Sequence, residues 1–243
     1  MPIAKGKKQP MKTQTEILRT ELIEMVRISQ RTVDYTTKAH ELGRPEYAQR
    51  ACFGRDRLVC LNNRICCVTS AMRKSFRAVD SEVDFGESIR TISVHLLDAC
   101  QHAYKISFLS VGFTACKVYE PPCYLVTMGA NINAAMRLCA VAIINQEVRH
   151  AEVARRGIDY WRSDVAPTSS SRGDVKEPNL ICGCHERTIA RWMLEMMDDL
   201  YTVAVGSAAM VGADSDAPRR SISETSRCSR SVQVEYDTLS SIS

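Results

Sequence analysis

The second half of the chain repeats the first half. A shift of 103 residues places the segment around Leu22 on the segment around Leu125. Identical residues then coincide in both segments, namely Leu22 and Leu125, Met25 and Met128, Ala39 and Ala142, Ala48 and Ala151, Ala51 and Ala154, Gly54 and Gly157, and Asp56 and Asp159. One register held over this many positions indicates that a single structural unit occurs twice in the chain.

A smaller shift of 97 residues relates the last segment of each half. It pairs Arg90 with Arg187, Ile92 with Ile189, Leu97 with Leu194, Asp98 with Glu195, Gln101 with Asp198, and Ile106 with Val203. Because this shift is shorter, the second copy has a shorter path between its second and third segments. The two copies therefore share a plan but differ in one connection.

Each segment has the apolar spacing of an amphipathic helix. In the first segment the apolar residues are Leu18, Leu22, Met25, Val26 and Val33, which form one stripe on a helix. The same pattern predicts helices at 15–42, 45–79, 87–111, 124–145, 147–163 and 180–211. Gly43 and Pro45 are typical of the end of one helix and the first turn of the next. The predicted fold class is all-α, with two tandem, pseudo-symmetric three-helix bundles.

The repeat also sets the expected domain organisation. We assign residues 14–112 to the first unit and residues 123–212 to the second. Residues 1–13 are basic and read as a flexible tail, and residues 213–243, rich in Ser, Arg and Asp, are expected to be disordered. A polar break at 80–86 and a loop at 167–178 are expected inside the two units.

One segment, residues 125–144, is apolar enough to be compared with a membrane span. It contains Asn131, Asn133 and Arg137, whose side chains are costly in lipid. Its apolar residues also follow a helical stripe. Because 45% of the chain is hydrophobic, a sizeable core is available, and we predict a core helix with no transmembrane segment.

The chain has eleven cysteines. Several, such as Cys52, Cys100 and Cys139, fall at core positions of the predicted helices. The N-terminal residues are polar and basic and have no apolar stretch of the signal-peptide type. We therefore expect a reducing, cytoplasmic location, where the thiols act as small apolar side chains.

Charge gives only a weak indication of partners. The net charge is +4, and much of the excess lies in the tails, so we expect no nucleic-acid binding. A basic helical protein that binds nucleic acid or a membrane surface stays open as an alternative. Positive stripes occur on the second and fifth predicted helices, at Arg55, Arg57, Arg149, Arg155 and Arg156. They are either solvated or dock onto an acidic partner.

The sequence has no motif that indicates an enzyme. No Walker-type glycine loop is present, and none of the five histidines lies in a nucleophile or base motif. His95, Asp98 and His102 fall on one helix and can cluster, but a lone helix seldom makes an active site. The CGCH run at 182–185 offers soft zinc ligands without a second ligand pair. We expect no catalytic residues.

Several segments together resemble the PhoU family of phosphate-signalling regulators. They are ILRTELIEM near the start, AHELGRPEYAQRACFGRD and its second copy VAIINQEVRHAEVARRGID, and LLDACQHAYKI with its second copy IARWMLEMMDDLYTVA. Their order, spacing and duplication carry the resemblance, which covers about residues 15–212. It implies two linked three-helix bundles in a cytoplasmic homodimer. It also implies a non-catalytic adaptor whose partners are the phosphate-transporter ATPase and the phosphate-responsive kinase or regulator.

The resemblance further implies a possible metal site. The family's Glu-x-x-x-Asp motif places two carboxylates on one helix face, where they can bind a divalent, iron-type or zinc-type cation. This chain has Leu97 and Gln101 at the first motif, and Leu194 and Asp198 at the second.

A one-residue rotation of each helix presents different pairs. They are Asp98 with His102, and Glu195 with Asp199. The candidate ligands are therefore Asp98, Gln101, His102, Glu195, Asp198 and Asp199. They are either metal ligands, as in a helical-bundle metal-binding protein, or ordinary polar residues of a helix surface.

Overall fold

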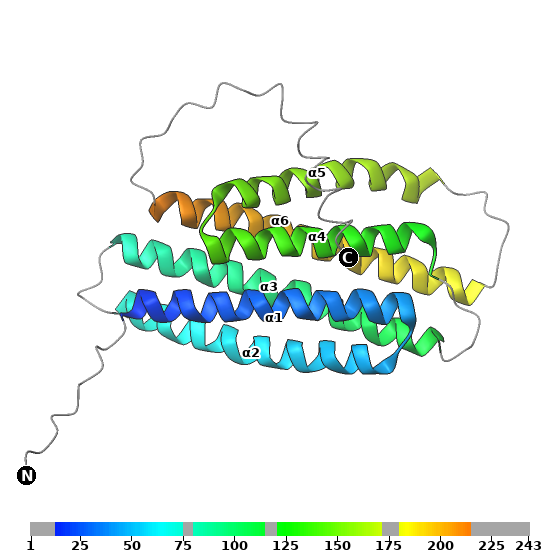
Figure 1. The fold of residues 1–243 in the computed structure, drawn as a ribbon, viewed down its shortest axis with the longest axis horizontal. Helices are drawn as coiled ribbons and strands as arrows, with labels where there is room; N and C mark the ends of the chain where they lie inside the picture. The colour runs from blue at the N-terminus through cyan, green and yellow to red at the C-terminus, as the bar shows by residue number, and fades with distance from the viewer. Residues whose placement is uncertain (1–12, 75–79, 115–120, 172–179, 215–243) are drawn as a thin grey trace, which may run out of the picture.

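The computed structural model describes residues 13–74, 80–114, 121–171 and 180–214. Within these residues the chain forms six helices and no strand. They are α1 (Gln14–Leu42), α2 (Pro45–Lys74), α3 (Asp80–Thr114), α4 (Cys123–Asn145), α5 (Val148–Ser171) and α6 (Leu180–Asp214), as Figure 1 shows. The prediction of an all-α fold with two three-helix units is confirmed.

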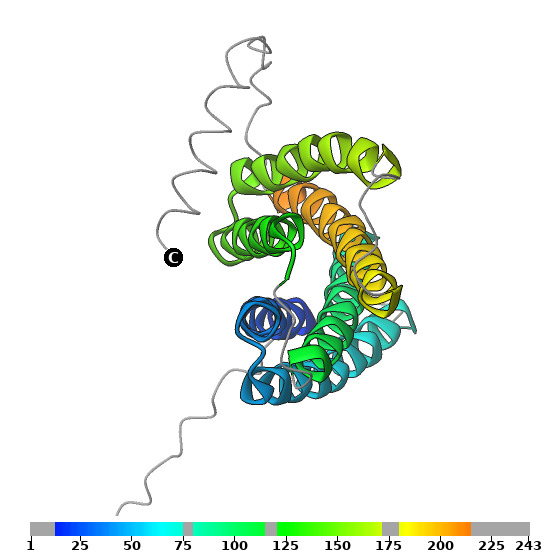
Figure 2. The same ribbon diagram turned by 90° about the vertical axis from the view of Figure 1, so that its right-hand side faces the viewer.

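Four of the six helices form a curved layer, and the other two lie on its inner side. Viewed end-on in Figure 2, α2, α3, α6 and α5 follow one another along the layer. Helix α1 packs on α2 and α3, and α4 packs in the same way on α5 and α6. The two units meet where α3 contacts α6 and where α1 contacts α4. The third helix of each unit therefore makes the main joint.

Local signals set both ends of α1. Thr13 caps its start, because the Thr13 hydroxyl accepts from the Glu16 N–H at 3.2 Å and the Glu16 carboxylate accepts from the Thr13 N–H at 2.9 Å. Gly43 ends it with φ of 61°, and its N–H donates to the Ala39 carbonyl at 2.9 Å. Pro45 then begins α2. The boundary at Gly43 and Pro45 was predicted correctly, whereas the helix starts one residue before the predicted position.

The second unit ends its first helix in the same way but with a less suitable residue. Gln146 is equivalent to Gly43 under the 103-residue shift, and it has φ of 59°. Its N–H donates to the Ala142 carbonyl, so the left-handed cap occurs in both units. A side chain is strained in this conformation, whereas glycine is not.

Equivalent positions of the two units fill equivalent parts of the core. Leu22 and Leu125 are both buried, and so are Ala51 and Ala154. Gly54 allows α2 to approach α1 closely, since a Cβ there would collide with the Thr32 hydroxyl. The repeat seen in the sequence is therefore a repeat of packing.

Two predicted breaks are wrong. Helix α3 begins at Asp80, so 80–86 is helical and not a polar break. Its acidic residues suit the first turn of a helix, and Gly86 packs against Leu18, Thr69 and Met72. Helix α5 continues to Ser171, so the start of the loop predicted at 167–178 is helical.

The other ends of the predicted segments are only partly described. Residues 75–79 and 172–179 lie outside the described residues, and so do the predicted tails, apart from Thr13 and the last residues of α6.

Among the described helices, α4 alone is long and apolar enough to span a membrane by length and composition. It lies against α1, α5 and α6, and 61% of its most apolar stretch is buried. This is the behaviour of a core helix, as predicted.

The eight cysteines that the structure describes are all free thiols. Burial raises the pKa of both Cys100 and Cys139 to about 12, so these two are inert core thiols. Cys52 is only half-buried.

Candidate functional site

Polar side chains line the contact between α3 and α6, which we call the seam. His95, Asp98 and His102 recur on α3 at spacings of three and four residues, which places them on one side of the helix. Glu195 and Asp199 are four residues apart on α6. All five are half-buried. The 3.6-residue period of each helix thus presents two polar rows to each other.

Two histidine–carboxylate contacts cross the seam. His95 Nδ1 lies 2.9 Å from Asp199 Oδ1, and His102 Nδ1 lies 3.1 Å from Glu195 Oε2. Asp98 completes a group with His95 and Asp199, in which one ligand atom from each residue lies within 4.8 Å of the others. The contacts run in opposite order along the two helices, so α3 and α6 are antiparallel.

Burial disfavours the charged form of the Asp199 carboxyl at the seam. It raises the pKa of the Asp199 carboxyl, and the nearby Asp98 carboxylate raises that pKa further. The hydrogen bond and the charge of His95 act in the opposite direction. The seam therefore brings two carboxylates together and offsets their repulsion with an imidazole.

The two registers of candidate ligands face different neighbours. One residue turns a helix by about 100°, and Asp198 accordingly pairs with Arg162 on α5 instead of facing the seam. Gln101 is equivalent to Asp198 under the repeat, and one residue likewise turns it by about 100° from the seam residue His102. The structure thus gathers Asp98, His102, Glu195 and Asp199, while the metal assignment itself stays a prediction.

His95 is the seam residue that the predicted ligand set omits. Its spacing of three residues from Asp98 is a local signal, but its partner Asp199 is 104 residues away. It also breaks the repeat, because the equivalent residue in α6 is Trp192. Trp192 therefore makes a different contact across the seam, in which Lys105 Nζ of α3 lies 5.9 Å from the centre of the Trp192 ring.

One imidazole and two carboxylates make a reasonable donor set for a cation. Zn²⁺, Fe²⁺ and Mn²⁺ all accept nitrogen and oxygen ligands of this kind. His95 Nδ1 already bonds Asp199, so a cation would have to replace this hydrogen bond. The alternative is a hydrogen-bonded network that fixes the two units against each other.

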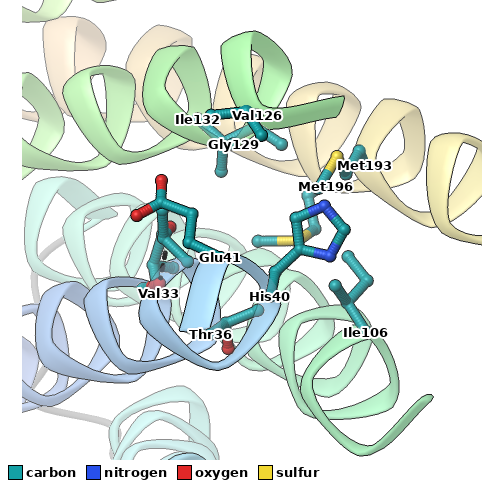
Figure 3. Close-up of a pocket in the computed structure, with 11 residues that line it drawn as sticks. Val33, Thr36, His40, Glu41, Ile106, Val126, Gly129, Ile132, Met193 and Met196 are labelled. Carbon is teal, nitrogen blue, oxygen red and sulfur yellow. Dashed lines mark hydrogen bonds between the residues drawn. The ribbon is translucent and has the colours of Figure 1, made fainter. Parts of the chain in front are cut away.

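A pocket lies at one end of the joint between the units (Figure 3). It is lined by α1, α3, α4 and α6 and is mainly apolar, and His40 contributes its imidazole. His40 Nδ1 lies 2.9 Å from Ser110 Oγ, which itself donates to the Ile106 carbonyl at 2.8 Å. The ring nitrogen is therefore the donor. Burial lowers the pKa of His40 to about 4, so the ring is neutral at pH 7.

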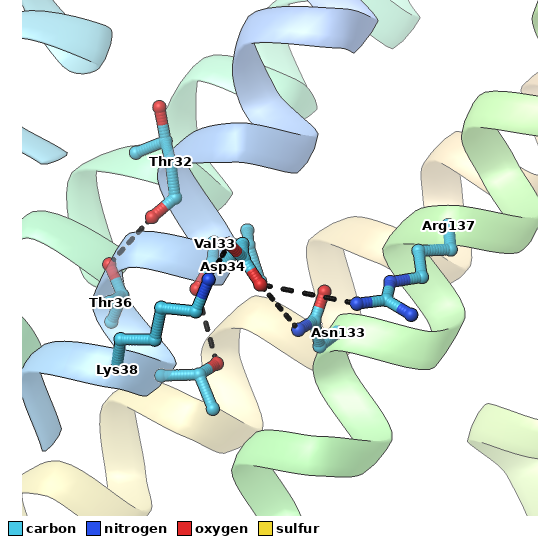
Figure 4. Close-up of polar contacts among 8 residues, drawn as sticks. Thr32, Val33, Asp34, Thr36, Lys38, Asn133 and Arg137 are labelled. Carbon is cyan, nitrogen blue, oxygen red and sulfur yellow. Dashed lines mark hydrogen bonds and ion pairs between the residues drawn. The ribbon is translucent and has the colours of Figure 1, made fainter. Parts of the chain in front are cut away.

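The contact between α1 and α4 also has a polar centre (Figure 4). Asp34 on α1 accepts from Asn133 on α4 at 3.5 Å and lies 4.0 Å from Arg137. Lys38 pairs with the same carboxylate at 2.9 Å. The two units are thus joined by polar contacts on both sides, at the seam and at Asp34.

The predicted arginine stripes have acidic neighbours. Arg57 pairs with Glu24 and Arg55 with Asp56. On α5, Arg155 lies 3.4 Å from Asp159, and Arg156 lies 3.8 Å from Glu152. Arg149 is exposed. These pairs compensate most of the positive charge, and a role of these arginines in docking stays a prediction.

The CGCH run lies at the start of α6. Cys184 is exposed and accepts from Arg187 at 3.4 Å. Among the side chains that the structure describes, neither Cys184 nor His185 belongs to a group of three potential ligands. The side chain of Cys182 lies outside the described residues.

The arrangement defines a class of protein in which two three-helix bundles join through their third helices. No family profile and no curated protein sequence matches the chain. In three dimensions it is similar to PhoU from Pseudomonas aeruginosa, with a TM-score of 0.61 and 13% sequence identity. The similarity covers 82% of this chain and 94% of that one. The chain therefore has the PhoU fold, as the sequence resemblance implied.

Proposed function

We propose that the chain is a PhoU-like regulator of phosphate uptake and phosphate-responsive signalling. The observation that carries this proposal is the shared fold, which spans nearly the whole of the solved PhoU chain. The ordered and duplicated sequence motifs support it independently. Because a shared fold does not fix a function by itself, the proposal depends on both.

In this role the chain works as a cytoplasmic adaptor and carries out no chemistry. Its partners are the ATPase of the phosphate transporter and the phosphate-responsive kinase or regulator, and it acts as a homodimer. The two units meet through polar contacts at the seam and at Asp34. A partner that binds one relative placement of the two units better than another would shift the balance between them.

Phosphate uptake in a deletion strain tests the adaptor role. The gene is deleted, and the uptake rate of labelled phosphate is measured in phosphate-rich medium. We expect unrestrained uptake, and normal uptake after the wild-type gene is restored. Binding of the purified chain to the purified ATPase subunit is measured alongside. Unchanged uptake together with no binding would contradict the proposal.

A second candidate function is metal binding at the seam. The group formed by His95, Asp98 and Asp199 favours it. Metal content of the purified protein is measured after incubation with Zn²⁺, Fe²⁺ or Mn²⁺ and dialysis. We expect about one ion per chain in the wild type and none in Asp199→Asn. Asp198→Asn is the matched control, because Asp198 faces Arg162. Equal metal content in both variants would exclude this site.

A further inference from the structure

Two exposed apolar side chains stand at equivalent positions of the two units. Phe108 on α3 is 69% exposed, and Val205 on α6 is 43% exposed. They are 97 residues apart, which is the shift that relates α3 to α6. The other exposed large apolar residues among those described are Leu42, Phe53, Val59, Tyr124 and Tyr160. Each of these is equivalent to a polar or charged residue in the other unit.

The two side chains stand on the same kind of support. Tyr104 precedes Phe108 by one turn, and their ring centres are 6.2 Å apart. The Arg55 guanidinium, from α2, lies 4.3 Å from the centre of the Tyr104 ring. We call these three residues the Phe108 platform.

The second unit has a similar set, in which the tyrosine and the apolar residue are equivalent to those of the first unit while the arginine comes from a different position of the repeat. Tyr201 precedes Val205 by one turn and is equivalent to Tyr104. The Arg162 guanidinium, from α5, lies 4.8 Å from the centre of the Tyr201 ring. Arg162, Tyr201 and Val205 form the Val205 platform. Stacking of a guanidinium on an aromatic ring stabilises each platform.

Both arginines already have a carboxylate partner. Arg55 Nε donates to Asp56 Oδ1 at 3.0 Å, and Arg162 pairs with Asp198. Because these charges are compensated, each platform presents mainly its apolar side chain to a partner. The complementary group is therefore an apolar side chain rather than an acidic one.

Phe108 and Val205 each follow a buried residue of the same helix, Ile106 and Val203, by two residues. Two residues turn a helix by about 200°, so both exposed side chains point away from the core, toward the outer side of the layer. Helices α1 and α4 both cover the inner side of the layer (Figure 2). The pseudo-two-fold axis that exchanges the two units therefore carries the outer face of one unit onto the outer face of the other, and both platforms share that face.

His102 faces Glu195 across the seam, and the two helices are antiparallel. Phe108, six residues after His102, therefore lies opposite the part of α6 six residues before Glu195, near residue 189. Val205 is 16 residues further on, which corresponds to about 24 Å along the helix.

We propose that the two platforms bind equivalent sites on the two subunits of one homodimeric protein. A homodimer presents each of its surface patches twice about a two-fold axis. This chain carries a similar patch twice, once in each unit, so its two platforms can contact the two equivalent patches of such a homodimer. After the first platform has bound, binding of the second takes place within the same complex and is favoured by the high effective concentration. The inference rests on the proposed adaptor role, which calls for such a partner.

Site-specific photo-crosslinking in cells tests this inference. A photoreactive phenylalanine replaces Phe108 in one full-length variant and Val205 in another, and crosslinked peptides are identified by mass spectrometry. We expect both positions to crosslink to the same segment of the same partner polypeptide. Phe53 and Tyr160, which are 66% and 56% exposed, are the control positions and should not reach that segment. Crosslinks to different segments, to one position only, or to no protein would overturn the inference.

Stoichiometry with the captured partner gives a second test. We expect one partner dimer for each chain, and therefore two partner dimers for each homodimer of this chain. Binding should be weaker by about tenfold or more in both Phe108→Ala and Val205→Ala. Phe53→Ala should bind like the wild type. Two chains per partner dimer would overturn the inference.

The two tests separate this inference from the proposed function. A shared homodimeric partner with no part in phosphate transport or signalling would support the platforms and contradict the proposed function. Capture of a phosphate regulator by one platform alone would support the proposed function and contradict the inference about the two platforms.

Discussion

The two three-helix units keep their core and differ where they contact each other and where their helices end. Leu22 and Leu125 occupy the same buried position, yet the buried His40 of the first unit corresponds to Ile143 of the second. The seam pairs His102 with Glu195 on one side of the pseudo-axis, and Asp98 with Asp199 on the other. The repeat therefore fixes the fold, while these differences give each unit its own chemistry.

The largest expected effect comes from the core positions that the units share. We expect Leu22→Ala and Leu125→Ala each to lower the free energy of unfolding by about 3 kcal/mol, because both side chains are fully buried. Denaturant unfolding followed by circular dichroism measures both. A much smaller loss in one variant, or two separate transitions, would show that the units unfold independently.

The difference between His40 and Ile143 predicts a pH effect of similar size. Because burial lowers the pKa of His40 from 6.5 to about 4, the unfolded chain binds a proton between these values and the folded chain does not. Stability is therefore complete above pH 6.5 and falls as the pH drops toward 4, by up to about 3 kcal/mol.

Replacing His40 by the residue of the second unit tests this effect. His40→Ile should flatten the dependence of the unfolding midpoint on pH between 6.5 and 4. His150→Gln, which alters a half-buried histidine on α5, is the control and should keep the dependence. An unchanged pH profile in His40→Ile would contradict the role of His40.

The close approach of α1 and α2 predicts a smaller loss. Gly54→Ala should destabilise the first unit by about 2 kcal/mol, since the added Cβ collides with the Thr32 hydroxyl. Thr32→Ala in the same chain should restore most of the loss. Gly112→Ala is the control, because a Cβ there meets nothing within 4 Å. Equal melting temperatures of Gly54→Ala and the wild type would rule out this contact.

The smallest effect concerns the caps of the first helix in each unit. Gln146 holds φ of 59° where the first unit has Gly43 at 61°. Gln146→Gly should raise the free energy of unfolding by about 1 kcal/mol, and Gly43→Gln should lower it by a similar amount. The pair of variants is measured by thermal unfolding. Shifts of the same sign would contradict the equivalence of the two caps.

The sequence predicted those parts of the molecule that depend on local or repeated signals. Gly43 and Pro45 marked a helix boundary correctly, and the 103-residue shift identified the duplicated unit. The predicted break at 80–86 was wrong because local polarity was outweighed by the packing of Gly86 against Leu18 and Met72.

The candidate site was harder to predict because its contacts are remote. Asp98 and Asp199 were named as candidates from their spacing along each helix. His95 was left out of the ligand set because it lies outside the four-residue pairs related to the family motif, and its partner Asp199 is 104 residues away. The choice between the two registers depends on the rotation of α3 and α6 relative to each other, which no local pattern reveals. Only the packed structure shows that Asp199 faces the seam while Asp198 faces Arg162 on α5.

The measurement that tests the account most directly is the expression of phosphate-starvation genes in phosphate-rich medium. It is compared in the wild type, in a strain that lacks the gene, and in that strain with the gene restored. The account predicts that these genes are switched on in the deletion strain and silenced again on restoration. Silent starvation genes in the deletion strain would contradict a regulatory role and leave a protein that shares only the PhoU fold.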